Sequence, residues 1–125
     1  MRLLLDTHAL LWALKEPDRL SDRARDALLD QGNDVLVSAV SPWEIAIKVA
    51  VGRLSVSGDM PAEMERFGFA ELPVRFNHAA AVRDLPLLHR DPFDRMLVAQ
   101  ARYEGLTLVT RDAQVRAYPV ASLEA

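Results

Sequence analysis

The chain has 125 residues, of which 50% are hydrophobic and 26% charged, which is the composition of an ordinary globular domain with a real core. It contains no cysteine, which excludes disulfides and suits a reducing cytosol, so we expect a cytoplasmic protein, and no stretch approaches the roughly 18 apolar residues of a membrane span. The 15 basic and 18 acidic residues leave a net charge of −3, so any binding of nucleic acid has to be local or metal-mediated.

The first third of the chain predicts two strands and two helices. Leu3–Leu5 is a short apolar run bounded by polar residues, which is typical of a strand buried on both faces. A mostly buried helix is predicted over Ala9–Leu14. Ser21 is a suitable N-cap for an amphipathic helix over Asp22–Asp30. A second interior strand is predicted at Val35–Ser38.

The middle of the chain continues this alternation. Ser41 at the cap, Pro42 at the first helical position and Glu44 at the third predict a helix with a capping box. This helix is expected to run to about Val51. Three further elements are predicted, namely a helix over Met60–Phe67, an edge strand over Ala70–Val74 and a helix over His78–Leu85 capped by Asn77.

The last third predicts a helix that reaches Glu104 and is stopped by Gly105. A strand follows at Leu106–Val109, and Tyr118–Ala121 is expected to add a final short strand. Because strands alternate with helices throughout, we expect an α/β fold with a central parallel sheet covered on both faces. The predicted organisation is a single three-layer α/β/α domain over residues 1–125.

Four acidic side chains lie close to predicted strand ends. Asp6 directly follows the first strand, Glu44 lies in the first turn of the helix after the second, and Asp112 follows the Leu106–Val109 strand by three residues. Asp94 opens the helix that leads into that strand. Because parallel strands end at one edge of a sheet, where α/β proteins bind ligands, we expect all four carboxylates to meet there.

Carboxylates crowded in this way either take up protons or are neutralised by a cation. At about 6 Å and an effective dielectric near 20, each pair of charges costs roughly 2–3 kcal/mol. Oxygen ligands without His or Cys at metal spacing favour Mg²⁺, for which Mn²⁺ can substitute. A water activated at such a site is a nucleophile for phosphodiester hydrolysis. The coincidence of four acids therefore favours a metal site, although each acid taken alone could equally be a helix cap.

Other candidates for chemistry are weaker. His8, His78 and His89 are scattered too widely for a metal triad, and we expect them on the surface or at helix caps. Trp12 and Trp43 are expected in the core rather than as stacking platforms.

Basic side chains flank the acids. Arg90, Arg95 and Arg111 either bind an RNA backbone or form balancing ion pairs. Lys48 follows Glu44 by one helical turn, so an ion pair between them is expected. No GxGxxG, P-loop or CxxC motif is present.

Four ordered blocks carry a family resemblance, namely Leu4–His8 with Trp12, Ser41–Ile45 with Lys48, Asp91–Arg95 with Ala99 and Ala101, and Leu108–Asp112 with Tyr118. In these blocks the chain resembles the PIN-domain family, and within it the VapC-type toxins of bacterial toxin–antitoxin pairs. The resemblance implies a Mg²⁺-dependent endoribonuclease that is held inactive by a cognate VapB-like antitoxin and is usually a homodimer. The apolar first helices would suit a groove for an antitoxin helix.

Carried over by position, the resemblance implies a catalytic site of four acids, which are Asp6, Glu44, Asp94 and Asp112. Among them, Asp6 and Asp94 would be the direct metal ligands. Thr7 and Thr110 would form hydrogen bonds beside the metal, with Asp91 and Arg95 as possible supporting residues, although the pattern gives Asp91 no definite role.

Two functions of other classes remain compatible with the residues. The acids could receive the basic side chains of a partner in a non-catalytic binding module. A receiver or phosphotransfer domain also carries acids at this edge. Such a domain needs an acidic pair after the first strand or an Asp-x-Asp motif, whereas Thr7 and His8 follow Asp6 here.

Overall fold

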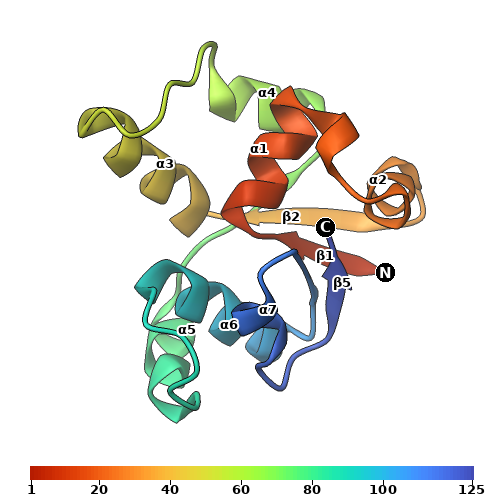
Figure 1. Cartoon of the computed structure of the whole chain (residues 1–125). Coiled ribbons are helices and arrows are strands. Elements are labelled where there is room, and N and C mark those ends of the chain that lie inside the picture. The colour runs from red at the N-terminus through yellow and green to blue at the C-terminus, as the bar shows by residue number, and fades with distance from the viewer.

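In a computed structural model of all 125 residues, the protein has a five-stranded sheet in which every neighbouring pair of strands is parallel (Figure 1). The strands lie in the order β3-β2-β1-β4-β5. Their bounds are Arg2–Leu5 for β1, Asp34–Ser38 for β2, Ala70–Leu72 for β3, Thr107–Thr110 for β4 and Ser122–Glu124 for β5. The expected parallel sheet is confirmed, and β3 lies at its edge as predicted.

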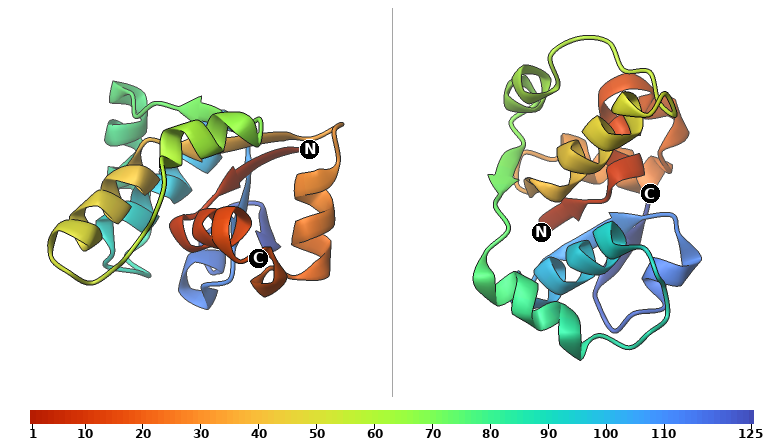
Figure 2. Two further views of the ribbon diagram at one scale, coloured as in Figure 1. Left: turned by 90° about the horizontal axis from the view of Figure 1, so that it is seen from above. Right: turned by 90° about the vertical axis from the view of Figure 1, so that its left-hand side faces the viewer.

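Seven α-helices flank this sheet, and the views in Figure 2 show them on both of its faces. Their bounds are Thr7–Lys15 for α1, Asp22–Leu29 for α2, Val40–Ala50 for α3, Met60–Arg66 for α4, Phe76–Ala81 for α5, Pro92–Glu104 for α6 and Ala113–Arg116 for α7. Two single-turn 3-10 helices lie at Pro17–Arg19 and Val82–Asp84. None of the helices combines the length and hydropathy that a membrane crossing requires.

The three leucines of β1 are fully buried and belong to both layers of the core. Leu3 and Leu5 pack with residues of α1, α2 and α4 on one face, whereas Leu4 packs with residues of α6 on the other. Successive side chains of a strand point to opposite faces, so a strand between two helical layers needs apolar residues at every position. Each buried leucine contributes about 2 kcal/mol of apolar burial, which fixes β1 at the centre of the sheet.

The connections of the sheet change direction between β1 and β4. The chain leaves β1 toward β2 and β3 on one side, and later enters β4 and β5 on the other. This reversal opens a crevice at the carboxyl ends of the strands, where open α/β sheets bind ligands. Asp6 lies at the crevice because its backbone N–H donates to the Val109 carbonyl at 3.1 Å and so extends the β1–β4 ladder by one residue.

The start of α3 differs from the predicted capping box. The helix begins at Val40, and its N-cap Ala39 has no side chain that can accept a hydrogen bond. Ser38 takes over this role, because its Oγ accepts a hydrogen bond from the Val40 N–H at 3.1 Å. Ser41 is fully buried inside the helix, which leaves Glu44 free of any capping role.

Two further predictions about local structure are wrong. Arg75, and not Asn77, is the N-cap of α5, because the buried His78 ring accepts the Arg75 N–H at its Nδ1. The predicted strand Tyr118–Ala121 is absent and β5 begins only at Ser122. That segment contains a proline, which has no N–H to donate to a neighbouring strand.

Candidate metal centre

Asp6 is placed at the crevice by the end of β1 and the start of α1. Its side chain is the N-cap of α1, with Oδ1 accepting the Ala9 N–H at 2.8 Å, and the residue is only 5% exposed. Burial raises the pKa of the Asp6 carboxyl, while a hydrogen bond with Thr110 lowers it. Asp6 therefore serves as a cap and still presents a poorly hydrated carboxylate to the crevice.

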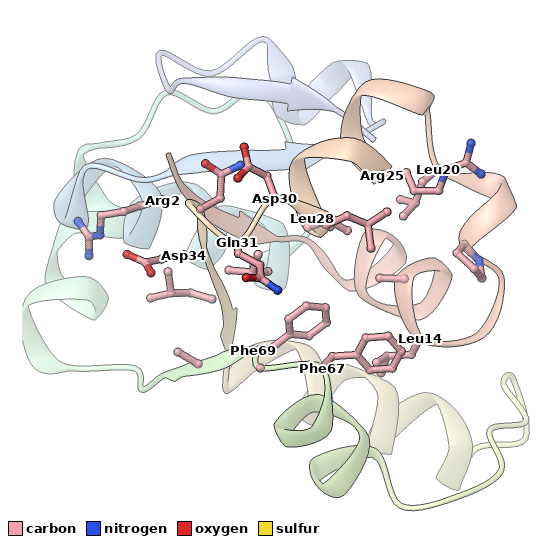
Figure 3. Close-up of a pocket in the computed structure, with 18 residues that line it drawn as sticks. Arg2, Leu14, Leu20, Arg25, Leu28, Asp30, Gln31, Asp34, Phe67 and Phe69 are labelled. Carbon is pink, nitrogen blue, oxygen red and sulfur yellow. The ribbon is translucent and has the colours of Figure 1, made fainter.

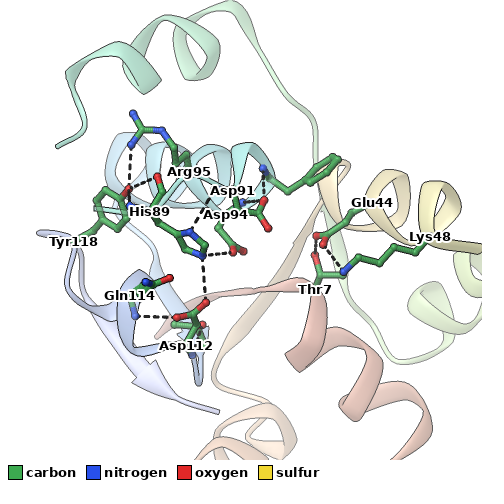
Figure 4. Close-up of polar contacts among 12 residues, drawn as sticks. Thr7, Glu44, Lys48, His89, Asp91, Asp94, Arg95, Asp112, Gln114 and Tyr118 are labelled. Atoms are coloured by element: carbon green, nitrogen blue, oxygen red, sulfur yellow. Dashed lines mark hydrogen bonds and ion pairs between the residues drawn. The ribbon is translucent and has the colours of Figure 1, made fainter. Parts of the chain in front are cut away.

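Glu44 reaches the same crevice from α3 and is held there by two side chains (Figure 4). Its Oε1 accepts a hydrogen bond from the Thr7 hydroxyl at 2.7 Å, and its Oε2 lies 2.9 Å from the Lys48 ammonium. The predicted ion pair with Lys48 is confirmed. The Ser41 hydroxyl lies 3.2 Å from the Thr7 hydroxyl and can donate to it, since the Thr7 proton is directed at Glu44, so buried polar contacts at the first turn of α1 fix the orientation of Glu44.

Asp94 and Asp112 approach each other across the crevice through His89 (Figure 4). The His89 Nε2 lies 3.2 Å from Asp94 Oδ2 and 3.3 Å from Asp112 Oδ2. The His89 Nδ1 accepts the Asp91 N–H at 3.4 Å, so the proton of the neutral ring lies on Nε2 and is directed at both carboxylates. His89 was predicted on the surface or at a helix cap, and instead it lies between two of the predicted acids.

His89 is held in this position by an anchor of Arg95 and Tyr118. The Tyr118 hydroxyl accepts the His89 N–H at 2.9 Å and lies 3.3 Å from the His89 carbonyl, to which it donates. The Arg95 guanidinium donates to the same hydroxyl at 3.0 Å and to the carbonyls of Pro86 and Val82. Arg95 therefore supports the site by fixing the segment that carries His89, and its donors are not directed at solvent.

We expect Tyr118→Phe to lower the free energy of unfolding by about 1–3 kcal/mol, because the change leaves the His89 N–H and one Arg95 donor without a partner in a part-buried place. Urea denaturation with an unchanged m-value would show this. Tyr103→Phe is the matched control, since the Tyr103 hydroxyl accepts one hydrogen bond from Asn77 at the surface. Equal losses for both variants would contradict the role of Tyr118 as an anchor.

The carboxylates of the crevice affect each other's protonation. The pKa of Asp94 is raised from 3.8 to about 7, first by burial and then by the negative charges of Asp91, Asp6 and Glu44. Asp112 contributes in the same direction to the raised pKa of Asp6. The four predicted acids thus lie near enough to affect one another, although only Asp94 and Asp112 share a cluster with His89, and without a cation burial and then repulsion by the other acids keep a proton on Asp94 near neutral pH.

Asp91, Asp112 and Thr110 each also stabilise the local backbone through a hydrogen bond. Asp91 is the N-cap of α6, with Oδ1 accepting the N–H groups of Phe93 and Asp94 at 2.8 and 3.3 Å. Asp112 is the N-cap of α7 and accepts the Gln114 N–H at 2.8 Å. The Thr110 hydroxyl accepts the Asp112 N–H at 3.2 Å, which holds the backbone between β4 and α7.

The donor set fits a divalent cation. One ligand atom from each of His89, Asp94 and Asp112 lies within 4.8 Å of the others, so a single ion can reach all three after small side-chain movements. The Nε2–H of His89 now bridges two carboxylates, which is the role that a cation between them would take over. Because carboxylates dominate the cluster, a hard, oxygen-preferring ion suits it best.

A central parallel sheet with acidic side chains at its β1–β4 crevice defines an α/β protein with an acidic site at the carboxyl ends of its strands. Comparison with known families shows to which family it belongs. The family model described as the PIN domain matches residues 3–121, so the chain belongs to the PIN-domain family. It is 31% identical over 123 residues to Ribonuclease VapC22 of Mycobacterium tuberculosis, an alignment that covers 92% of this chain and 90% of that protein.

Solved structures show the same fold. VapBC2 from Rickettsia felis, bound to a DNA fragment from its promoter, superposes with a TM-score of 0.73 at 16% identity and 98% coverage of both chains. FitAcB from Neisseria gonorrhoeae superposes with a TM-score of 0.62 at 23% identity, covering 98% of this chain and 96% of that one. At these identities the likeness establishes the fold only.

Proposed function

We propose that this protein is a Mg²⁺-dependent endoribonuclease and the toxin of a toxin–antitoxin pair that acts in the cytoplasm. The observation that carries the proposal is the acidic crevice, in which Asp94 and Asp112 share a cluster with His89 and the charges of Asp6 and Glu44 help to raise the pKa of Asp94, a shift that a cation would reverse. The name of the relative in Mycobacterium tuberculosis, a ribonuclease, supports RNA as the substrate.

In this proposal the four acids have different roles. Asp6 and Asp94 would hold the ion directly, and Glu44 and Asp112 would complete the site. A bound divalent ion supplies neutralisation of phosphate charge and activation of water for attack on phosphorus. Glu44, oriented by Thr7, or Asp112 would accept the proton of the attacking water.

The proposed antitoxin would bind a groove between α1, α2 and α4. This groove has a volume of about 910 Å³ and is lined mainly by apolar side chains (Figure 3). Leu14 and Leu28 line it from α1 and α2, and Phe67 and Phe69 line it from the segment that ends α4. An apolar groove of this kind suits an amphipathic helix, and related folds are found in complexes of VapB and VapC proteins.

A homodimer would bury a second apolar surface beside the crevice. Trp43 is 61% exposed, which corrects its predicted place in the core, and its ring meets Phe93 edge to face at 5.1 Å. Val74 and Met96 extend this surface around a hollow of about 480 Å³. We propose this Trp43–Phe93 surface as the contact between two copies of the chain.

The proposed activity is tested with purified protein and a mixed RNA pool, with Asp6→Asn as the matched variant. We expect cleavage with Mg²⁺ or Mn²⁺, no cleavage in excess EDTA, and recovery when the metal is returned. Mn²⁺ titration without RNA should saturate in the wild type and weaken in Asp6→Asn. Full activity in a demonstrably metal-free sample would contradict the proposal.

A non-catalytic binding module would give a different result, since no saturable binding of Mn²⁺ is then expected in the absence of a partner. A receiver domain fits the structure less well, because the strand order 3-2-1-4-5 differs from the 2-1-3-4-5 order of flavodoxin-like receivers.

A further inference from the structure

A polyanionic substrate needs cations along its path, yet two of the three arginines that flank the acids, Arg95 and Arg111, are otherwise engaged. Arg95 donates to backbone carbonyls and to Tyr118. Arg111 donates through Nε to the Ala125 carbonyl at 2.9 Å and through Nη2 to the Arg19 carbonyl. Its guanidinium carbon lies 4.5 Å from the centre of the Trp12 ring. Arg90, the third, is exposed and forms no ion pair or side-chain hydrogen bond, so it can meet one phosphate beside Asp91, and a longer polyanion needs further cations.

A second groove lies between α1, α3 and the segment that follows α3, and we call it the α1–α3 groove. Its volume is about 470 Å³. Four basic side chains line it, Lys15, Arg19, Lys48 and Arg53, against a single acid, Glu16. Lys15 and Lys48 pair with Glu63 and Glu44, which are not among the lining residues, and Arg19 pairs with Glu16, so the uncompensated positive charge of the groove is that of Arg53. On a chain of net charge −3 this charge is local, and it favours anions at the groove although the whole protein does not.

The α1–α3 groove is continuous with the acidic crevice. Thr7 and Lys48 both line the groove, and both contact the Glu44 carboxylate, at 2.7 and 2.9 Å. A strand of phosphates lying in the groove would thus arrive directly beside the proposed metal ligands. The basic groove adjoins the acidic crevice. A polyanion could therefore place most of its phosphates in the groove and one phosphate at the proposed metal ion in the crevice.

The basic residues of the groove differ in how strongly ion pairs and hydrogen bonds within the protein hold their side chains. Lys15 is committed to structure, since its ammonium lies 2.7 Å from Glu63 and donates to the Ser57 carbonyl at 2.9 Å. Arg19 lies over the Trp12 ring at 5.2 Å and pairs with Glu16 through side chains that are both more than half exposed. Such exposed pairs contribute little and exchange readily for a phosphate.

Arg53 is the freest of these cations. It is exposed and forms no ion pair and no side-chain hydrogen bond. It lies just after the Gly52 turn, where its backbone N–H donates to the Lys48 carbonyl at 2.9 Å, so its Cα is fixed against the end of α3. A guanidinium on a fixed backbone, with no acid beside it, is well suited to bind phosphate.

We propose that the α1–α3 groove binds the sugar–phosphate backbone of single-stranded RNA next to the scissile phosphate, with Arg53 as its principal contact and Arg19 and Lys48 as secondary ones. This inference rests on the proposed nuclease function and specifies the path of its substrate. The groove neutralises charge without reading base edges, so it adds affinity that is largely independent of sequence.

The test measures the binding of a fluorescent single-stranded RNA by anisotropy over a range of salt concentrations, in an Asp94→Asn background that keeps the RNA intact. Each lost phosphate contact reduces the slope of log K against log salt by about 0.7 for single strands. We expect this reduction and several-fold weaker binding for Arg53→Gln, and a preserved slope for Arg53→Lys.

Arg83→Gln is the matched control, because it removes the same charge from a side chain that is 88% exposed and lies outside the groove, in the Val82–Asp84 turn. An equal change in Arg83→Gln and Arg53→Gln, or no change in either, would overturn the proposal. A change in the binding of a protein partner alone, with RNA binding unaffected, would overturn it as well. RNA that binds through Arg53 but is not cleaved by the wild type would refute the nuclease function and support the groove.

Discussion

Replacing Asp94 with Asn is expected to reduce RNA cleavage by about 10³-fold, because a direct metal ligand contributes several kcal/mol of transition-state stabilisation and each factor of ten in rate corresponds to about 1.4 kcal/mol. We assign this role to Asp94 first, since the charges of Asp91, Asp6 and Glu44 all act on its carboxyl and its Oδ2 lies 3.2 Å from the His89 Nε2. Single-turnover cleavage with saturating Mg²⁺ would measure the loss.

The control for this change lies three residues earlier in the same turn. Asp91 is the N-cap of α6, and asparagine caps a helix about as well as aspartate, so Asp91→Asn should preserve the fold and retain most of the activity. A comparable loss in both variants would show that Asp91 belongs to the metal centre. Retained activity in Asp94→Asn would remove the main support for the proposed metal ligands.

The stability of the metal-free protein is expected to fall as the pH rises from about 5 to 8. The pKa of Asp94 is about 7 in the folded chain and about 3.8 when unfolded, so between these values the folded state holds a proton that the unfolded state releases. Stability then decreases with pH, by about 2 kcal/mol between pH 5 and pH 7 for this group alone. Urea denaturation in EDTA at several pH values would measure it.

Bound Mg²⁺ should oppose this loss of stability at high pH. Mg²⁺ binds the ionised carboxylates of the folded state, so its stabilising effect should be larger at pH 8 than at pH 5.5. Asp94→Asn should flatten the metal-free profile, because the residue whose proton is released no longer titrates. A metal-free wild type whose stability rises steadily over this range would contradict the raised pKa and the crowding of the acids.

The sequence by itself determined the framework of this protein. An uninterrupted apolar run such as Leu3–Leu5 can be satisfied only between two helical layers, which predicts a central parallel strand. The alternation of strands and helices then places Asp6, Glu44, Asp94 and Asp112 at one edge without any knowledge of side-chain contacts. These are consequences of local periodicity and of the common direction of parallel strands, and both are visible in a sequence.

The tertiary structure alone decided which polar side chains of different elements meet, whereas the Glu44–Lys48 pair within one helix was predicted from its spacing. His89 joins Asp94 and Asp112 because the segment before α6 folds back over the crevice and is anchored there by Arg95 and Tyr118. The sequence placed Trp43 in the core, although its ring lies on the surface. Contacts of this kind depend on which side chains meet after the layers pack, and no spacing along the chain encodes them. For the same reason a chain of net charge −3 gave no sign of the positive α1–α3 groove, whose cations come together only when α1 packs against α3.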